Sequence, residues 1–129
     1  MNRLGAVVVE ARDPRALARF YANLLDLPIT SAEDDWVDVG HTGATRLSFQ
    51  LAPEHQPPAW PDPASPMQFH LDIDVDDIDA AEATALELGA TRLPWPPEWD
   101  DPAPESGERT DGFRVYADPA GHPFCLCRA

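Results

Sequence analysis

Residues 69–77 read FHLDIDVDD and alternate strictly between apolar and polar side chains. Such an alternation is typical of a β-strand that buries only one of its faces. The apolar residues Phe69, Leu71, Ile73 and Val75 would face a core, whereas His70, Asp72, Asp74 and Asp76 would form a polar row. The pattern therefore predicts a strand with a histidine and several carboxylates along its other face.

A helix is predicted directly after this strand, over residues 78–88, because Asp76 or Asp77 can cap its start and Gly89 can end it. The same order occurs 64 residues earlier, where an apolar strand at residues 4–11 precedes Asp13 and a proline typical of a first helical turn. The next apolar residues have the spacing of one helix face: Leu17, Phe20, Tyr21, Leu24 and Leu25.

Three short strands are expected after each helix. They fall near residues 28–32, 35–39 and 45–51 in the first half, and near 90–95, 113–119 and 124–128 in the second. Proline-rich stretches at 52–66 and 96–111 read as loops. The internal repeat predicts one α+β domain over residues 1–129, with module one at about 4–52, a linker at 53–66 and module two at about 67–128.

The composition restricts the class of partner. The chain has 129 residues, 9 of them basic and 23 acidic, which gives a formal net charge of −14. Nucleic acids and anionic membranes are disfavoured, since both require clustered Lys and Arg, whereas a cationic ligand would be attracted. The sequence has no apolar run of about 18 residues, and from its first residues we expect no signal peptide. Cys125 and Cys127 are expected to stay reduced, which favours a cytoplasmic protein.

Three segments resemble the vicinal-oxygen-chelate superfamily of glyoxalase and bleomycin-resistance proteins. They are VVVEARDPRALARFYANLLDLP at 7–28, FHLDIDVDDIDAAEATALELGA at 69–90 and FRVYADPAGHPFCL at 113–126. The resemblance implies a fold of two βαβββ modules whose curled sheets enclose a cleft, with the helices on the other faces. It also implies that His70, Asp72 and Asp74 look into that cleft or lie along its rim, and that the chain forms a homodimer.

The metal-using members of this superfamily hold a divalent ion on four strand positions. By resemblance these positions fall on Ala6, Gln50, His70 and Cys125. Ala6 offers no donor atom and Gln50 only a neutral carbonyl oxygen, so that His70, Gln50 and Cys125 are the three possible donors. We therefore expect no metal cofactor, and Cys125 can equally be a small residue of the core.

Other residues are candidates for contact with a small molecule. Arg114 and Tyr116 share one parity of a late strand and could face the cleft together with His70, Asp72 and Gln50. Trp60 and Trp95 lie in or beside proline-rich loops and could stack on an aromatic or cationic ligand, or could instead fasten these loops to the sheet. Glu10 is a candidate general base, although an acid at a strand end is more often simply exposed.

Two functions are consistent with these residues. The first is a metal-independent protein that binds a small, cationic or aromatic molecule in its cleft. The alternative is a metal-dependent lyase, isomerase or thiol transferase of the glyoxalase I type, in which the ion polarises a substrate oxygen. A structural partner domain without any ligand is a third possibility.

Overall fold

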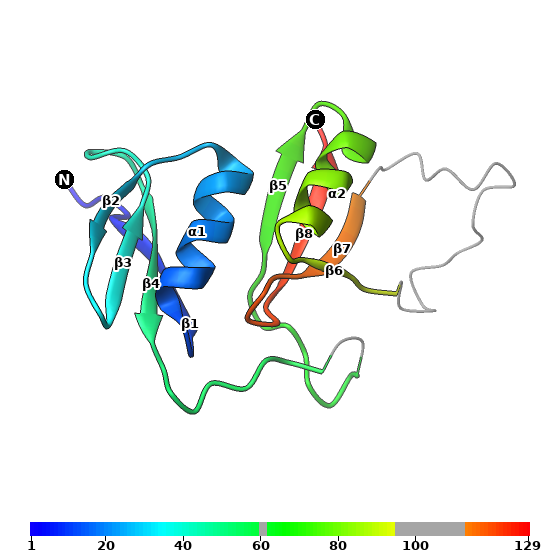
Figure 1. Ribbon diagram of the computed structural model, residues 1–129, viewed down its shortest axis with the longest axis horizontal. Coiled ribbons are helices and arrows are strands. Elements are labelled where there is room, and N and C mark those ends of the chain that lie inside the picture. The colour runs from blue at the N-terminus through cyan, green and yellow to red at the C-terminus, as the bar shows by residue number, and fades with distance from the viewer. Residues whose placement is uncertain (60–61, 95–112) are drawn as a thin grey trace, which may run out of the picture. The chain divides into compact units, whose positions relative to one another are not determined.

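The computed structural model describes residues 1–59, 62–94 and 113–129 and divides the chain into two compact units, Met1–Gln56 and Pro57–Ala129. We call these units module one and module two. Each contains a four-stranded sheet and one helix, in the order strand, helix, three strands (Figure 1). The predicted α+β fold of two βαβββ modules is therefore confirmed. Trp60 and Trp95 lie outside the described residues.

Module one comprises β1 (Ala6–Ala11), α1 (Pro14–Leu25), β2 (Ile29–Ala32), β3 (Trp36–Val39) and β4 (Arg46–Leu51). The strand order in its sheet is β1-β4-β3-β2, and β1 pairs with β4 in parallel while the other pairs are antiparallel. The helix begins where the sequence predicts, because the Asp13 side chain accepts a hydrogen bond of 3.1 Å from the backbone N–H of Ala16.

The core of module one lies between α1 and one face of its sheet. Tyr21 of α1 stacks on Phe49 of β4 with 5.6 Å between the ring centroids, and Phe20 meets Tyr21 edge-to-face at 4.9 Å. Leu17, Ala18 and Phe49 are also buried. The predicted apolar face of the helix therefore packs against the helix-facing residues of β4.

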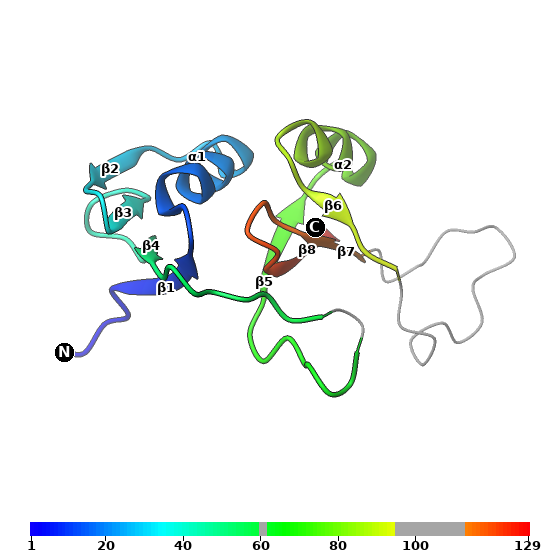
Figure 2. The same cartoon turned by 60° about the horizontal axis from the view of Figure 1, so that its bottom comes forward.

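Module two repeats this arrangement with β5 (Leu71–Val75), α2 (Ile78–Glu87), β6 (Thr91–Arg92), β7 (Phe113–Ala117) and β8 (Pro123–Arg128). Its strand order is β5-β8-β7-β6, with β5 and β8 parallel. Asp77 caps α2 through the N–H groups of Asp79 and Ala80. Figure 2 shows each helix lying over one face of its own sheet. We call the opposite face of each sheet its open face.

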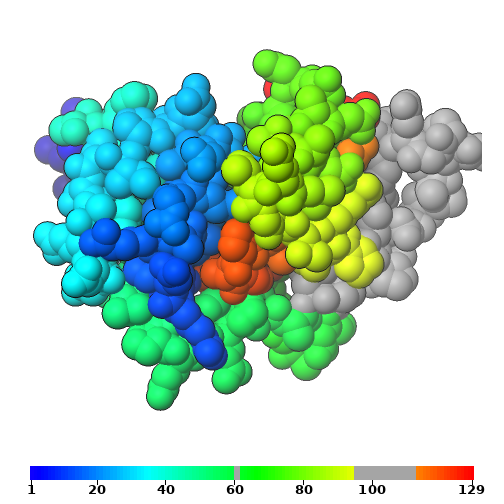
Figure 3. Space-filling model, in the orientation of Figure 1, coloured from blue at the N-terminus to red at the C-terminus, as the bar shows by residue number. Residues whose placement is uncertain are grey.

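The helix-covered side of module two holds an aromatic pair. Tyr116 of β7 stacks on Phe124 of β8 at 5.4 Å, and both rings are fully buried. Phe124 pairs in register with Leu71, so the apolar residues of β5 also lie on this side. In the space-filling view, α2 and the chain that follows it toward β6, coloured yellow-green, cover this side of the module (Figure 3).

One apolar residue of the opening motif does not join the core. Phe69 is 67 % exposed, because β5 begins only at Leu71. Before it, Gln68 has a φ of 61°, and the N–H of Phe69 donates to the carbonyl of Met67 at 2.6 Å. The prediction that Phe69 packs under the helix is therefore wrong, since the chain turns there before the alternation of a strand sets in.

No helix among residues 1–59, 62–94 and 113–129 is long and apolar enough to cross a membrane.

Candidate functional site

The open face of module two brings together a histidine, an aspartate and a cysteine. Asp72 of β5 and Cys125 of β8 are register partners in the parallel pair, and His70 lies two residues before Asp72, just outside β5. The His70 Nε2 atom lies 3.1 Å from Asp72 Oδ1. One ligand atom from each of the three residues lies within 4.8 Å of the others. We call this group the His-Asp-Cys cluster.

The His-Asp-Cys cluster is open to solvent at one end and closed at the other. The side chains of His70 and Asp72 are 38 % and 61 % exposed, whereas Cys125 is buried. Asp74 and Cys127 form the next register pair along the same face. Among the described residues Asp74 makes no ion pair, and the one ion pair of Asp72 is with His70.

Both cysteines are free thiols with raised pKa values. Burial raises the pKa of Cys125 to about 12, and the charge of Asp72 and the interaction with Cys127 act in the same direction. Burial followed by the charges of Asp72 and Asp74 also raises the pKa of Cys127. The shift at Cys125 favours its neutral thiol over the thiolate, which is the form that reacts as a nucleophile.

We expect Cys125 to resist alkylation in the folded, metal-free protein. Only the thiolate reacts, and a pKa of about 12 in place of the ordinary 9.0 lowers its population at pH 8 by roughly 1,000-fold. Iodoacetamide labelling of the Cys127→Ser variant in the presence of a chelator, followed by mass spectrometry, measures this rate. The same variant unfolded in guanidinium gives the reference rate, and equal rates in both states would contradict the expected pKa.

The open face of module one differs from its counterpart. Val8 of β1 pairs with Ser48 of β4, whereas Asp72, which lies 64 residues after Val8, pairs with Cys125. By strand register the module-one counterpart of Cys125 is therefore Ser48, whereas the resemblance places a family metal position on Gln50. Ser48 is buried and donates a hydrogen bond of 2.5 Å to Asp38, which also accepts one of 2.8 Å from the Trp36 indole.

Gln50 and Glu10 lie together at the end of this sheet. They are register partners in the parallel pair of β1 and β4, and both are exposed. Glu10 also lines an open hollow of about 620 Å³ together with residues 52–56, among them Glu54 and His55. This hollow is a second acidic surface, formed within module one alone, and Glu10 as a general base stays a prediction.

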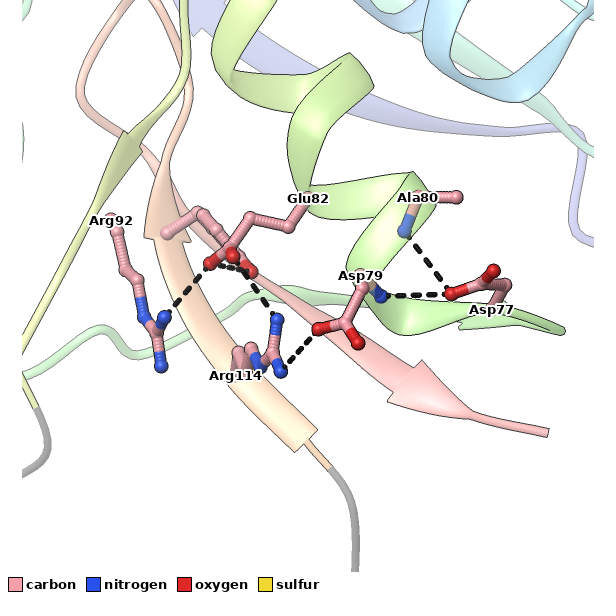
Figure 4. Close-up of polar contacts among 7 residues, drawn as sticks. Asp77, Asp79, Ala80, Glu82, Arg92 and Arg114 are labelled. Atoms are coloured by element: carbon pink, nitrogen blue, oxygen red, sulfur yellow. Dashed lines mark hydrogen bonds and ion pairs between the residues drawn. The ribbon is translucent and has the colours of Figure 1, made fainter. Parts of the chain in front are cut away.

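Arg114 and Tyr116 are not on the open face, so the predicted placement of these two residues is wrong. Arg114 donates hydrogen bonds to Glu82 at 3.1 Å and to Asp79 at 2.8 Å, and Tyr116 donates one to Glu82 at 2.9 Å. Both acceptors belong to α2. Figure 4 shows Arg92 and Arg114 on either side of the Glu82 carboxylate, which Arg92 reaches at 3.0 Å. These residues hold the helix to the sheet.

Sequence reasoning missed two residues of these arrangements. Asp72 was expected in the polar row but was not counted as a metal donor, and Glu82 was not singled out at all. Same-face spacing from His70 was the available signal for Asp72. For Glu82 the available signal was that a carboxylate lies in the middle of a helix otherwise rich in Ala and Leu. A carboxylate that becomes partly buried when the helix packs on a sheet needs a basic or hydrogen-bonding partner.

The residues present fit only part of the four-strand metal site that the resemblance implies. In module one, Ala6 has no donor atom, and Ser48 is occupied by its hydrogen bond to Asp38. In module two, His70 and Cys125 have the side chains and the proximity that a metal ion requires, and Asp72 adds a third donor. The four-strand site is therefore incomplete, whereas one module by itself offers three donors.

A family model described as glyoxalase-like domain matches residues 6–127. A comparison with curated proteins found no match. Many solved structures share the fold, among them the following three. A glyoxalase/bleomycin resistance protein/dioxygenase family enzyme from Burkholderia phytofirmans PsJN is 19 % identical, with a TM-score of 0.69 and coverage of 98 % of each chain.

The other two structures are of an antibiotic binding protein and of a fosfomycin resistance protein. TnmS3, an antibiotic binding protein from Streptomyces sp. CB03234, is 20 % identical with a TM-score of 0.60, over 99 % of this chain and 96 % of its own. The fosfomycin resistance protein FosX from Mesorhizobium loti is 15 % identical with a TM-score of 0.68, over 100 % of this chain and 93 % of its own. At these identities the likeness shows the fold alone.

Proposed function

Since this chain belongs to the glyoxalase-like domain family, we propose that it binds a small, positively charged molecule, preferably one with an aromatic group, without help from a metal. The observation that carries this proposal is the acidic open face of module two. Asp72 and Asp74 project from β5 on this face, and the only basic side chain bonded to either of them in the described part of the chain is His70.

Electrostatics favour a cationic ligand on this face. Carboxylates two residues apart on a strand are roughly 7 Å apart, and their repulsion is about 2.4 kcal/mol at an effective dielectric of 20. A bound cation relieves this repulsion, and the net charge of −14 raises the local concentration of cations around the protein. TnmS3, an antibiotic binding protein, has the same fold, which is consistent with this proposal. That Trp60 and Trp95 stack on an aromatic group stays a prediction.

Titration calorimetry against basic aromatic compounds tests the proposal. Each compound is paired with its uncharged isostere, for example benzamidine with benzamide, and all solutions contain a chelator. We expect heat of binding from cationic members only, with affinity that falls as salt is added. Asp74→Asn should weaken binding by about fivefold, which corresponds to the free energy of about 1 kcal/mol that one exposed ion pair contributes. Glu87→Gln, an exposed change on α2, should leave it unchanged.

Two results would contradict this function. One is the absence of heat from every compound while circular dichroism shows a folded protein. The other is equal binding of the charged and the uncharged member of each pair, since attraction by carboxylates cannot produce it.

The proposal includes a homodimer that acts in the cytoplasm. A reducing compartment suits a chain whose two cysteines are free. In a dimer the partner subunit would cover the edge strands of each sheet, whose backbone groups are otherwise unpaired on one side. Sedimentation would then give twice the mass of 14.2 kDa, and the mass of a single chain would exclude a stable dimer.

The enzyme alternative has one observation in its favour, the His-Asp-Cys cluster. A lyase, isomerase or thiol transferase of the glyoxalase I type would require an ion that polarises a substrate oxygen, and this cluster is the group of residues among those described that could hold one.

A further inference from the structure

The His-Asp-Cys cluster has the chemistry of a metal site that is complete within one module. A tetrahedral zinc ion with bonds of about 2.0–2.3 Å sets its donors roughly 3.3–3.8 Å apart. The donors of the cluster already lie within 4.8 Å of one another, and His70 Nε2 is 3.1 Å from Asp72 Oδ1. The widest donor separation therefore exceeds the tetrahedral spacing by at most about 1.5 Å, a gap that rotation of the exposed His70 and Asp72 side chains would have to close.

The fold fixes the relative positions of these donors. Asp72 and Cys125 face each other across a parallel pair of strands, and this register is continuous from Leu71 to Val75. His70 directly precedes β5, and its Nε2 atom lies 3.1 Å from Asp72 Oδ1. Two of the three ligands therefore come from rigid neighbouring strands and the third from the residue directly before one of them. Such a site needs no large rearrangement when an ion binds.

The donor types select the ion. An imidazole nitrogen, a carboxylate oxygen and a sulfur suit Zn²⁺ far better than Ca²⁺ or Mg²⁺, which prefer oxygen ligands only. The carboxylate and the thiolate together carry two negative charges and neutralise a divalent ion. Because His70 and Asp72 are partly exposed, an ion can enter from solvent and keep a fourth position for water.

We infer that module two binds one zinc ion through His70, Asp72 and Cys125, with no ligand from module one. This inference goes beyond the proposed function, which needs no metal, and revises the expectation from sequence that no metal binds. Binding is a simple exchange: the Zn–S bond forms as the S–H bond of Cys125 breaks, and the proton passes to the buffer. In metal-using members of the superfamily, module one also supplies metal ligands, but Ala6 at one of these positions has no donor atom. Asp72 supplies the missing ligand here.

Cobalt and zinc titrations of the full, chelator-treated chain test the site. We expect one equivalent of Co²⁺ to produce a thiolate-to-cobalt charge-transfer band together with tetrahedral ligand-field bands, and one equivalent of Zn²⁺ to abolish both. Cys125→Ser should remove the charge-transfer band. Asp72→Asn and His70→Ala should each weaken zinc binding by about 100-fold. Each metal ion bound should release about one proton, measured from the heat in buffers of different ionisation enthalpy.

The matched control is Cys127→Ser, which removes the other thiol of the same strand face. The charge-transfer band should survive in this variant and disappear only when Cys125 is changed. Circular dichroism establishes that each variant is folded. A band that persists in Cys125→Ser, a band that is lost in Cys127→Ser, or the absence of stoichiometric binding would overturn the inference. Because the organic ligands are titrated with chelator present, failure of the metal site and failure of the proposed function are distinguishable.

Discussion

Phe49→Ala is expected to lower the free energy of unfolding by about 3–5 kcal/mol, the usual cost of removing a fully buried aromatic ring. Phe49 is completely shielded from solvent and stacks on Tyr21 with 5.6 Å between the centroids. The alanine leaves a cavity between α1 and β4 that the surrounding residues cannot fill. Chemical denaturation followed by circular dichroism measures the loss.

Leu51→Ala is the matched control, because Leu51 lies two residues further along the same strand, on the same side, but is partly exposed. Its cost should stay near 1 kcal/mol. If the two substitutions were equally costly, the position of the module-one core between α1 and β4 would be wrong.

Glu82→Ala should have the second largest effect, with a loss of about 2–3 kcal/mol. The Glu82 side chain is only 20 % exposed and accepts from Arg92, Arg114 and Tyr116. Its removal leaves the guanidinium of Arg114 and the buried phenol of Tyr116 without this acceptor. Burial raises the pKa of Tyr116 and the Glu82 carboxylate raises it further, so the phenol remains a donor and cannot adapt by losing its proton.

A double-mutant cycle separates this network from a general loss of helix stability. Glu82→Ala combined with Arg114→Ala should cost less than the sum of the two single changes, by about 1–3 kcal/mol. Asp79→Ala is the control, because Asp79 contacts Arg114 as well but its side chain is 80 % exposed. It should cost less than about 1 kcal/mol. Strict additivity of Glu82 and Arg114 would show that their contact does not stabilise the fold.

Most of the fold could be predicted because local signals and the global repeat agree. The caps Asp13 and Asp77, the spacing of apolar residues before Leu25 and the alternation in residues 71–75 each specify one element, and the structure confirms them. The strand predicted at 90–95 has only two residues, Thr91 and Arg92. After these two residues the N–H of Leu93 still donates to the carbonyl of Val115 at 2.9 Å, and Pro94 follows, a residue that is confined to edges and ends of strands.

The candidate site was harder to predict, because it depends on the register between strands far apart in the sequence. Parity by itself could not tell which side of β7 faces α2, and the wrong side was chosen for Arg114 and Tyr116. Both side chains bond to Glu82 of α2 and therefore lie on the helix-covered side of the sheet, and this partner is far from them in the sequence. In the same way, the contact of Asp72 with Cys125 follows from the pairing of β5 with β8, which no local pattern encodes.

The parallel pairing of the first and last strand of each module has a consequence for how the chain is made. Module one can close its sheet once Leu51 is available to pair with β1, whereas module two must hold β5 without its neighbour until β8 has been synthesised. Pairings between distant segments form slowly, and domains fold as units in the order of their synthesis. Module one should therefore fold first on the ribosome, while the residues of the His-Asp-Cys cluster meet only with the last strand.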